Sequence, residues 1–110
     1  PPGGRVKAPQ PPASATAARL AVKRASAACR AVRIRWNALR SDTINVLDIG
    51  HEPRALAIGD LTAELWAAEH ALAEAAAGWR QALAEREALP VAERWNLIDM
   101  ERWASAQALV

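Results

Sequence analysis

The sequence of 110 residues contains no tyrosine, no phenylalanine and a single cysteine. One cysteine, Cys29, excludes an internal disulfide, so nothing points to a small secreted protein held together by disulfides. We therefore expect an intracellular type of protein, either soluble or held within an assembly. No apolar run approaches the roughly 18–20 residues that a membrane-spanning helix needs, so we expect no transmembrane segment.

Large apolar side chains are scarce. Hydrophobic residues make up 52% of the chain, but 28 of them are alanine, and leucine, isoleucine and valine together number only 22. Each large buried side chain contributes roughly 1.5–3 kcal/mol, whereas alanine has little area to bury. A helical core of this composition is thin. We expect either closely packed alanine-lined helices or burial against other subunits or further copies of the chain.

Acidic residues are absent from residues 1–41, which carry nine Lys and Arg side chains. Residues 42–110 carry five Arg and all twelve acids, a sum of −7. This separation of charge is the strongest signal that is not structural. It leaves nucleic acid, an acidic protein partner, pairing within the chain and a membrane surface as alternatives.

The first twelve residues differ in composition from the rest of the chain. They hold five of the seven prolines and two of the five glycines, which predicts an extended tail or linker. Because the sequence begins with Pro1 rather than methionine, we expect it to be processed or part of a longer protein. Residues 13–110 are short enough to form one helical domain.

The clearest periodic pattern lies in residues 60–89. Apolar residues recur there at steps of three and four, which predicts a long amphipathic helix that begins with Asp60 as its cap. Gly78 lies in its middle, where it indicates a close helix approach or a kink. The predicted stripe consists of Leu61, Leu65, Ala68, Leu72, Ala76, Trp79 and Leu83.

An earlier helix is predicted at residues 15–39, with Ser14 or Thr16 as its cap. At about 100° per residue, small and apolar residues are predicted to share one face of this helix, and cations to share the opposite face. The apolar face is predicted to contain Ala21, Ala25, Ala28, Cys29, Val32, Trp36 and Leu39.

Residues 40–59 interrupt the helical pattern. They predict a connector with a short apolar piece at 44–49 and one or two helical turns from Pro53 to Ile58. A strand at 43–49 is the alternative, although the sequence offers no second strand to pair with it. Pro90 ends the second long helix and opens a third at 91–108. The predicted fold is therefore all-α, with a long antiparallel hairpin, a short helical or irregular connector and a third C-terminal helix.

A row of cations on the first helix is the best candidate site. Such a row, with no acid among its members, is typical of a surface that binds nucleic acid or an acidic partner. In the alternative interpretation, glutamates of the second helix (Glu64, Glu69, Glu74, Glu85 and Glu87) neutralise these cations internally or across a dimer. The row consists of Arg19, Lys23, Arg30, Arg33 and Arg40.

Tryptophan residues mark candidate protein interfaces, because tryptophan is enriched among interface anchors. Trp66 lies off the leucine stripe, and Trp95 and Trp103 lie on the third helix, which is apolar on several sides. In the alternative interpretation, the third helix or the connector covers Trp66. Trp36 and Trp79 fit the interior of the hairpin.

Sequence motifs for catalysis and for cofactors are absent. His70 and Glu74 lie one helical turn apart, but a metal site needs at least three converging ligands, and Cys29 reads as a small core residue. We expect no catalytic residue, no metal and no cofactor. A helix–turn–helix at residues 43–58 has only Arg54 for DNA contact, which is too little. Residues 13–40 also resemble an organellar presequence in composition.

Together these patterns predict a small non-enzymatic helical subunit of a larger assembly. Its basic first helix would contact nucleic acid or an acidic partner, and its tryptophans would contact other protein subunits or a second copy. The alternative is a purely protein–protein adaptor or oligomerising scaffold that makes no contact with nucleic acid.

Overall fold

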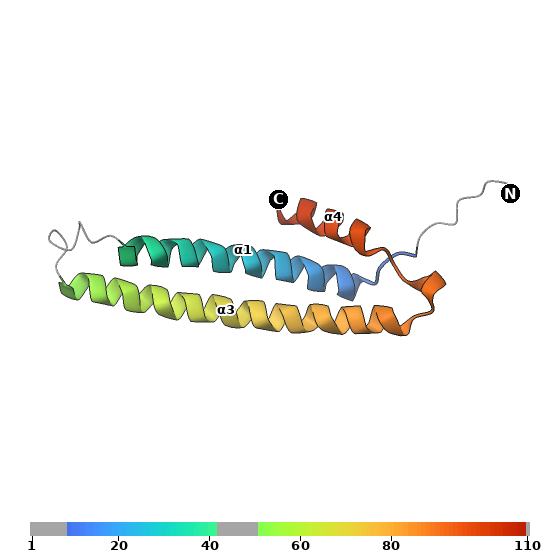
Figure 1. Ribbon diagram of the computed structural model, residues 1–110, viewed down its shortest axis with the longest axis horizontal. Coiled ribbons are helices and arrows are strands. Elements are labelled where there is room, and N and C mark those ends of the chain that lie inside the picture. Colours follow the sequence, from blue (N-terminus) through green and yellow to red (C-terminus); the bar gives the residue numbers. More distant parts are fainter. Residues whose placement is uncertain (1–8, 42–50, 110) are drawn as a thin grey trace. The chain divides into compact units, whose positions relative to one another are not determined.

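The computed structural model describes residues 9–41 and 51–109, and within these ranges every regular element is helical. Helix α1 spans Ala13–Ser41 and helix α3 spans His51–Ala88; a 3-10 turn, η1, at Val91–Glu93 leads to helix α4 at Leu97–Ala108. Helices α1 and α3 run in opposite directions and pack against each other, whereas α4 packs less extensively (Figure 1). The predicted all-α hairpin with a third helix is confirmed.

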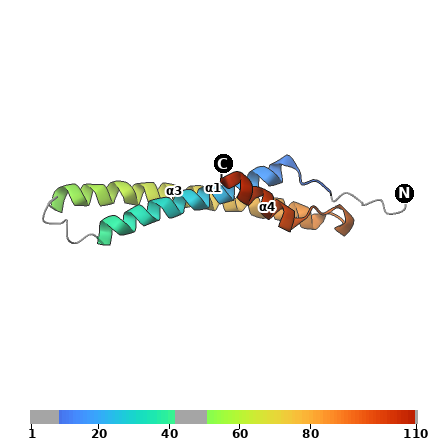
Figure 2. The same ribbon diagram turned by 90° about the horizontal axis from the view of Figure 1, so that it is seen from above.

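The chain divides into two compact units, each containing part of α1 and part of α3. Unit 1 consists of residues 1–23 and 75–110, and unit 2 consists of residues 24–74. In its described residues, unit 1 therefore holds the start of α1, the end of α3, η1 and α4. Among its described residues, unit 2 holds the end of α1 and the start of α3, two helices that run in opposite directions (Figure 2).

Helix α1 begins directly after the proline-rich tail. The carbonyl of Pro12 accepts hydrogen bonds from the amides of Ala15 and Thr16, at 3.0 and 3.2 Å. The Thr16 hydroxyl donates to the Ala13 carbonyl, so the predicted capping by Ser14 or Thr16 is wrong: both lie inside the first turn. Proline suits this role because its carbonyl remains a free acceptor although it lacks an N–H.

The buried stripe of α1 is only partly the predicted one. Cys29 and Val32 are buried as expected, but Ala21 and Ala28 are exposed. Burial follows steps of three and four along the helix, the pattern of a helix that packs lengthwise against another. The buried and half-buried positions of this stripe are Ala15, Ala18, Val22, Ala25, Cys29, Val32, Trp36 and Leu39.

Helix α3 begins at His51 rather than at the predicted Asp60. Pro53 lies in its first turn, where a missing N–H costs no hydrogen bond, and Gly59 is accommodated inside the helix. All seven residues of the predicted stripe are half-buried. A Cβ added at Gly78 would have no neighbour within 4 Å, so the close helix approach expected there is absent. The apolar piece predicted at 44–49 lies outside the described residues, and the separate short helix predicted after Pro53 is instead the start of α3.

The predicted third helix at 91–108 is broken. Residues 94–96 are not helical, and Asn96 caps α4 by accepting from the amides of Ile98 and Asp99 at 2.8 and 3.0 Å. Arg94 secures the turn, because its side chain donates to the carbonyls of Leu89 and Glu87 at the end of α3. This non-helical segment places the indole of Trp95, the residue before the cap, in the interior.

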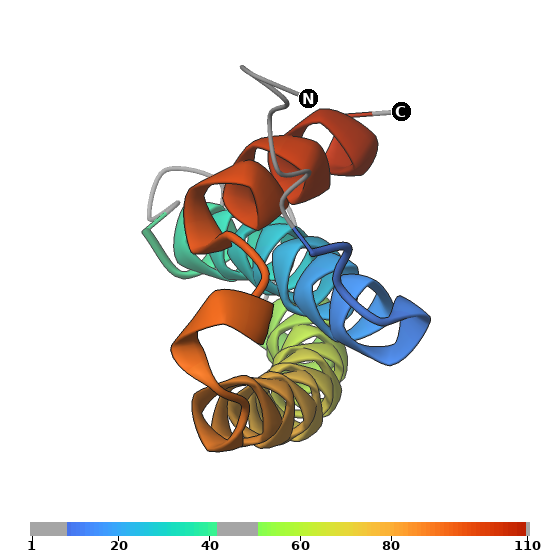
Figure 3. The same ribbon diagram turned by 90° about the vertical axis from the view of Figure 1, so that its right-hand side faces the viewer.

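That indole, Trp95, forms the centre of the core of unit 1. Trp95 is 2% exposed and packs with Met100, Ala15 and Ala82. Its ring centroid lies 6.0 Å from that of Trp79, with the planes inclined at 47°. Figure 3, which views this unit from its end, shows α4 beside α1 and the η1 segment beside the end of α3.

Candidate interaction surface

The predicted cations lie on one flank of α1, immediately beside its buried stripe and not on the opposite face as predicted. Arg19 and Arg33 each follow a stripe residue by one position, as do Lys23 and Arg30, so all four project to the same side at about 100° per residue. They are therefore placed to meet whatever packs beside α1. The structure brings them to different partners in the two units.

In unit 1, this flank is met by Glu101 of α4. The Arg19 guanidinium donates from Nε to Glu101 Oε2 at 2.7 Å, and Lys23 pairs with the other carboxylate oxygen. Hydrogen bonding from Lys23, the largest influence, and then the approach of Arg19 hold the pKa of Glu101 below its usual value of 4.5, although burial opposes the shift. Two of the five predicted cations thus hold α4 in place.

In unit 2, pairing occurs directly between α1 and α3. Arg33 Nη2 lies 3.1 Å from Glu69 Oε1, and Arg35 Nη1 lies 3.0 Å from Glu64 Oε1. These pairs lie on opposite sides of the stripes, as expected for two antiparallel helices with charges bordering their contact. Both are well exposed, and such pairs contribute only about 0–1 kcal/mol each.

Arg33 and Glu69 identify one side of unit 2, which we call the Glu69 flank. Trp66 precedes Glu69 by three residues and therefore lies on the same side of α3, and Arg30 lies three residues before Arg33 on α1. The Trp36 indole donates to the Thr62 hydroxyl at 3.0 Å on this flank. The Glu69 flank consists of Arg30, Arg33 and Arg40 on α1 and Thr62, Trp66 and Glu69 on α3.

The remaining cations of the predicted row differ in their surroundings. The Arg40 guanidinium lies over the Trp36 ring, 4.9 Å from its centroid. Arg30 is exposed and has no ion pair or hydrogen bond to any residue that the structure describes. Arg24 is likewise exposed and unpaired within the described ranges, but it projects to the opposite flank of α1. Arg35, absent from the predicted row, faces Glu64 on that flank.

The three predicted interface tryptophans have different environments. Trp95 is enclosed in the core of unit 1, so it is not available to a partner. Trp103 on α4 is 41% exposed. Trp66 is 70% exposed, the largest fraction among the tryptophans of the described segments. The alternative interpretation, in which the third helix or the connector covers Trp66, does not fit this exposure.

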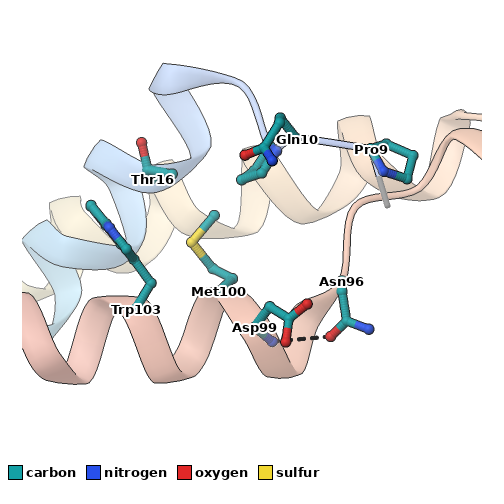
Figure 4. Close-up of a pocket in the computed structure, with 8 residues that line it drawn as sticks. Pro9, Gln10, Thr16, Asn96, Asp99, Met100 and Trp103 are labelled. Carbon is teal, nitrogen blue, oxygen red and sulfur yellow. Dashed lines mark hydrogen bonds between the residues drawn. The ribbon is translucent and has the colours of Figure 1, made fainter. Parts of the chain in front are cut away.

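Trp103 borders a hollow of about 370 Å³ in unit 1. Figure 4 shows Met100 and Trp103 extending from α4 toward Thr16 and the residues of the tail. Among the described residues of the lining, Asp99 is the one charged side chain, and Pro9 and Pro11 form part of the wall. The last residues of the tail are thus placed against α4.

The described side chains that could bind a metal ion or act as a nucleophile do not lie close together. In the described ranges, no three His, Cys, Asp or Glu residues are placed to share a metal ion. His70 pairs only with Glu74, one turn away on an exposed face, at 3.0 Å. Cys29 is buried, with Arg33 Nη2 at 3.8 Å from its sulfur.

Comparison with known protein families, curated proteins and solved structures gives no match for this chain. Within the part of the chain that the structure describes, no helix combines the length and the apolar character required to cross a bilayer. The interaction surface must therefore be interpreted from its own residues.

Proposed function

We propose that this chain is a non-enzymatic helical subunit of a larger assembly and that unit 2 binds an acidic protein partner through the Glu69 flank. The observation that carries this proposal is the position of Arg30, which has no ion pair with any described residue, on the same flank as the exposed indole of Trp66. Arginine and tryptophan are the residues most enriched among the side chains that dominate binding energy.

Incomplete burial in unit 2 supports a partner. Leu61, Leu65 and Leu72 lie on the stripe that faces α1, yet each remains only half-buried. Two helices can cover only one side of each other, and burial of apolar area stabilises by about 25 cal/mol per Å². A partner on the flank would remove further apolar surface from water, including most of the Trp66 ring.

The charges of the two helices favour a protein over nucleic acid as that partner. Helix α1 contains seven Lys and Arg residues and no acid, which is the feature that keeps nucleic acid as a second candidate. However, Arg19, Lys23, Arg33 and Arg35 already pair with glutamates of the same chain. These pairs neutralise four of the seven cations, which weakens a surface that would bind a phosphate backbone mainly by charge, whereas a protein partner can also bury the Trp66 indole.

Titration with two defined polyanions tests the proposal. The probes are a polyglutamate peptide and a DNA duplex, and binding is measured with the wild-type chain, Arg30→Glu and Arg24→Glu. The two variants change the net charge equally on opposite flanks of α1, so they form a matched pair. We expect Arg30→Glu to weaken polyglutamate binding about tenfold, as for loss of a charged contact, and Arg24→Glu to change it less than about twofold.

The DNA duplex separates the two candidate functions. If the duplex binds more tightly than polyglutamate and its affinity falls steeply with salt, by a slope of about −0.9 per phosphate contact, nucleic acid becomes the better assignment. Equal weakening by both variants would reveal general attraction to polyanions and remove the Glu69 flank as a specific site. Absence of binding to either probe would contradict the proposed function.

A further inference from the structure

We propose that the acidic partner binds the Glu69 flank as an amphipathic helix, in the manner in which α4 binds the same flank of α1 in unit 1. This inference rests on the proposed function and specifies the form of the partner. It predicts a helix with an apolar stripe, bordered by a glutamate that reaches Arg30.

Helix α4 shows what this flank accepts. Glu101 pairs with Arg19 and Lys23, while Met100, its neighbour in sequence, and Ala104, one turn further, are buried against the unit. One α-helix therefore supplies both a carboxylate for the cations and small or flexible apolar side chains for the adjoining surface. An extended peptide alternates its side chains between two faces, so it would not present this combination along one stripe.

The Glu69 flank of unit 2 repeats the chemistry that α4 meets, but without a covering helix among the described residues. Arg30 has the same position relative to the buried stripe as Lys23 has in unit 1. Arg33 has the same position as Arg19. Only Arg33 has an internal carboxylate, from Glu69. The apolar part of the contact is Trp66, whose large indole remains in solvent.

The length of the flank also suits a helix. From Arg30 to Arg40, the row rises about 15 Å along α1, at 1.5 Å per residue. Helix α4 has 12 residues, which corresponds to about 18 Å. A partner helix of three to four turns would therefore place its apolar stripe along Trp66 and bring its glutamates to the cations.

Two synthetic peptides of equal composition test this inference. The first has leucines at steps of three and four with glutamates beside them, and the second contains the same residues in scrambled order. Affinity is measured by fluorescence anisotropy of labelled peptide, and helix formation by circular dichroism. We expect the patterned peptide to bind at least about tenfold more tightly than the scrambled one and to gain helicity on binding, because only it presents an apolar stripe.

Variants of the chain locate the contact. Trp66→Ala should weaken the affinity for the patterned peptide about tenfold, as expected for loss of a tryptophan anchor. Arg30→Glu should weaken this affinity by a similar factor. Ile34→Ala is the matched apolar control, because Ile34 is 67% exposed but lies on the side of α1 that faces away from α3. Its effect should remain below about twofold. Replacement of the peptide's glutamates by glutamine should remove the dependence on Arg30.

Three outcomes would overturn the inference. If both peptides and polyglutamate bind equally and Trp66→Ala has no effect, the acidic partner stands but its helical form does not. If neither peptide nor polyglutamate binds, the proposed function fails as well. If sedimentation shows a dimer that Trp66→Ala converts to monomer, a second copy occupies the flank instead of an acidic helix.

Discussion

Unit 1 and unit 2 are built from opposite ends of the same two helices, yet they bury their side chains differently. In unit 1 the facing stripes are rich in alanine, including Ala15 and Ala82, and the segment after α3 contributes the large side chains of Trp95 and Met100. In unit 2, Cys29 and Val32 are buried where the two helices meet, but the leucines of the α3 stripe, such as Leu65, remain half-buried. Among the tryptophans of the described residues, only Trp95, which the third element supplies, is fully buried.

The electrostatics of the two units follow the same division. Glu101 comes from the third element of unit 1 and meets two cations of α1. In unit 2, glutamates of α3 pair with Arg33 and Arg35, and Arg30 is left unpaired among the described residues. The same flank of α1 is therefore covered by apolar and acidic groups in one unit and exposed in the other.

Trp95→Ala should have the largest effect, because it removes the element that distinguishes unit 1. Loss of a buried tryptophan costs about 3–5 kcal/mol of unfolding free energy, a large fraction of the stability of a small domain. The measurement is denaturant unfolding followed by circular dichroism. Trp95→Phe, which keeps an aromatic ring, should cost clearly less. A Trp95→Ala variant as stable as the wild-type chain would show that unit 1 does not depend on this core.

Helix α3 shows what the sequence predicts well. Its leucines contrast strongly with the glutamates between them, and all seven predicted stripe residues are half-buried. In α1, alanine occupies both the buried and the exposed sides, so spacing alone did not separate Ala18, which packs against the core, from the exposed Ala28. The prediction failed where side chains carry no contrast in hydrophobicity.

The candidate surface was predictable only in part. The acid-free row on α1 was evident from the sequence. Which of its cations form ion pairs depends on where α4 packs, and the sequence did not show this. Asn96 was the available signal for the break before α4, because asparagine is among the best N-caps. Placing the cap there exposes Glu101 to α1 and buries Trp95, neither of which follows from an unbroken helix.

Acidification should produce a smaller effect, through Glu101. Its pKa is lowered in the folded chain, so its contribution to stability is complete above its usual value of 4.5 and is lost as the pH falls through the lowered value. Denaturant unfolding between neutral pH and about pH 3 should show Glu101→Gln less stable at neutral pH, by up to about 1 kcal/mol for an exposed pair. The difference should vanish in acid.

Glu93→Gln is the matched control for that titration. Glu93 is exposed on η1 and has no hydrogen bond or ion pair from its side chain within the described residues. Its replacement should leave the pH profile close to that of the wild-type chain. A constant difference between Glu101→Gln and wild type at every pH would contradict the assigned role of the carboxylate in holding α4.

Trp66→Ala should have the smallest effect on stability, although it replaces tryptophan by alanine just as Trp95→Ala does. Trp66 is 70% exposed on α3, and surface substitutions usually stay within about 0.5 kcal/mol. Alanine also has the higher helix propensity, by less than about 0.7 kcal/mol, which offsets the lost contacts. Unfolding of the two variants in parallel therefore compares the units directly. A loss for Trp66→Ala near that for Trp95→Ala would mean that this indole packs within the chain, and the partner helix would then lose its anchor.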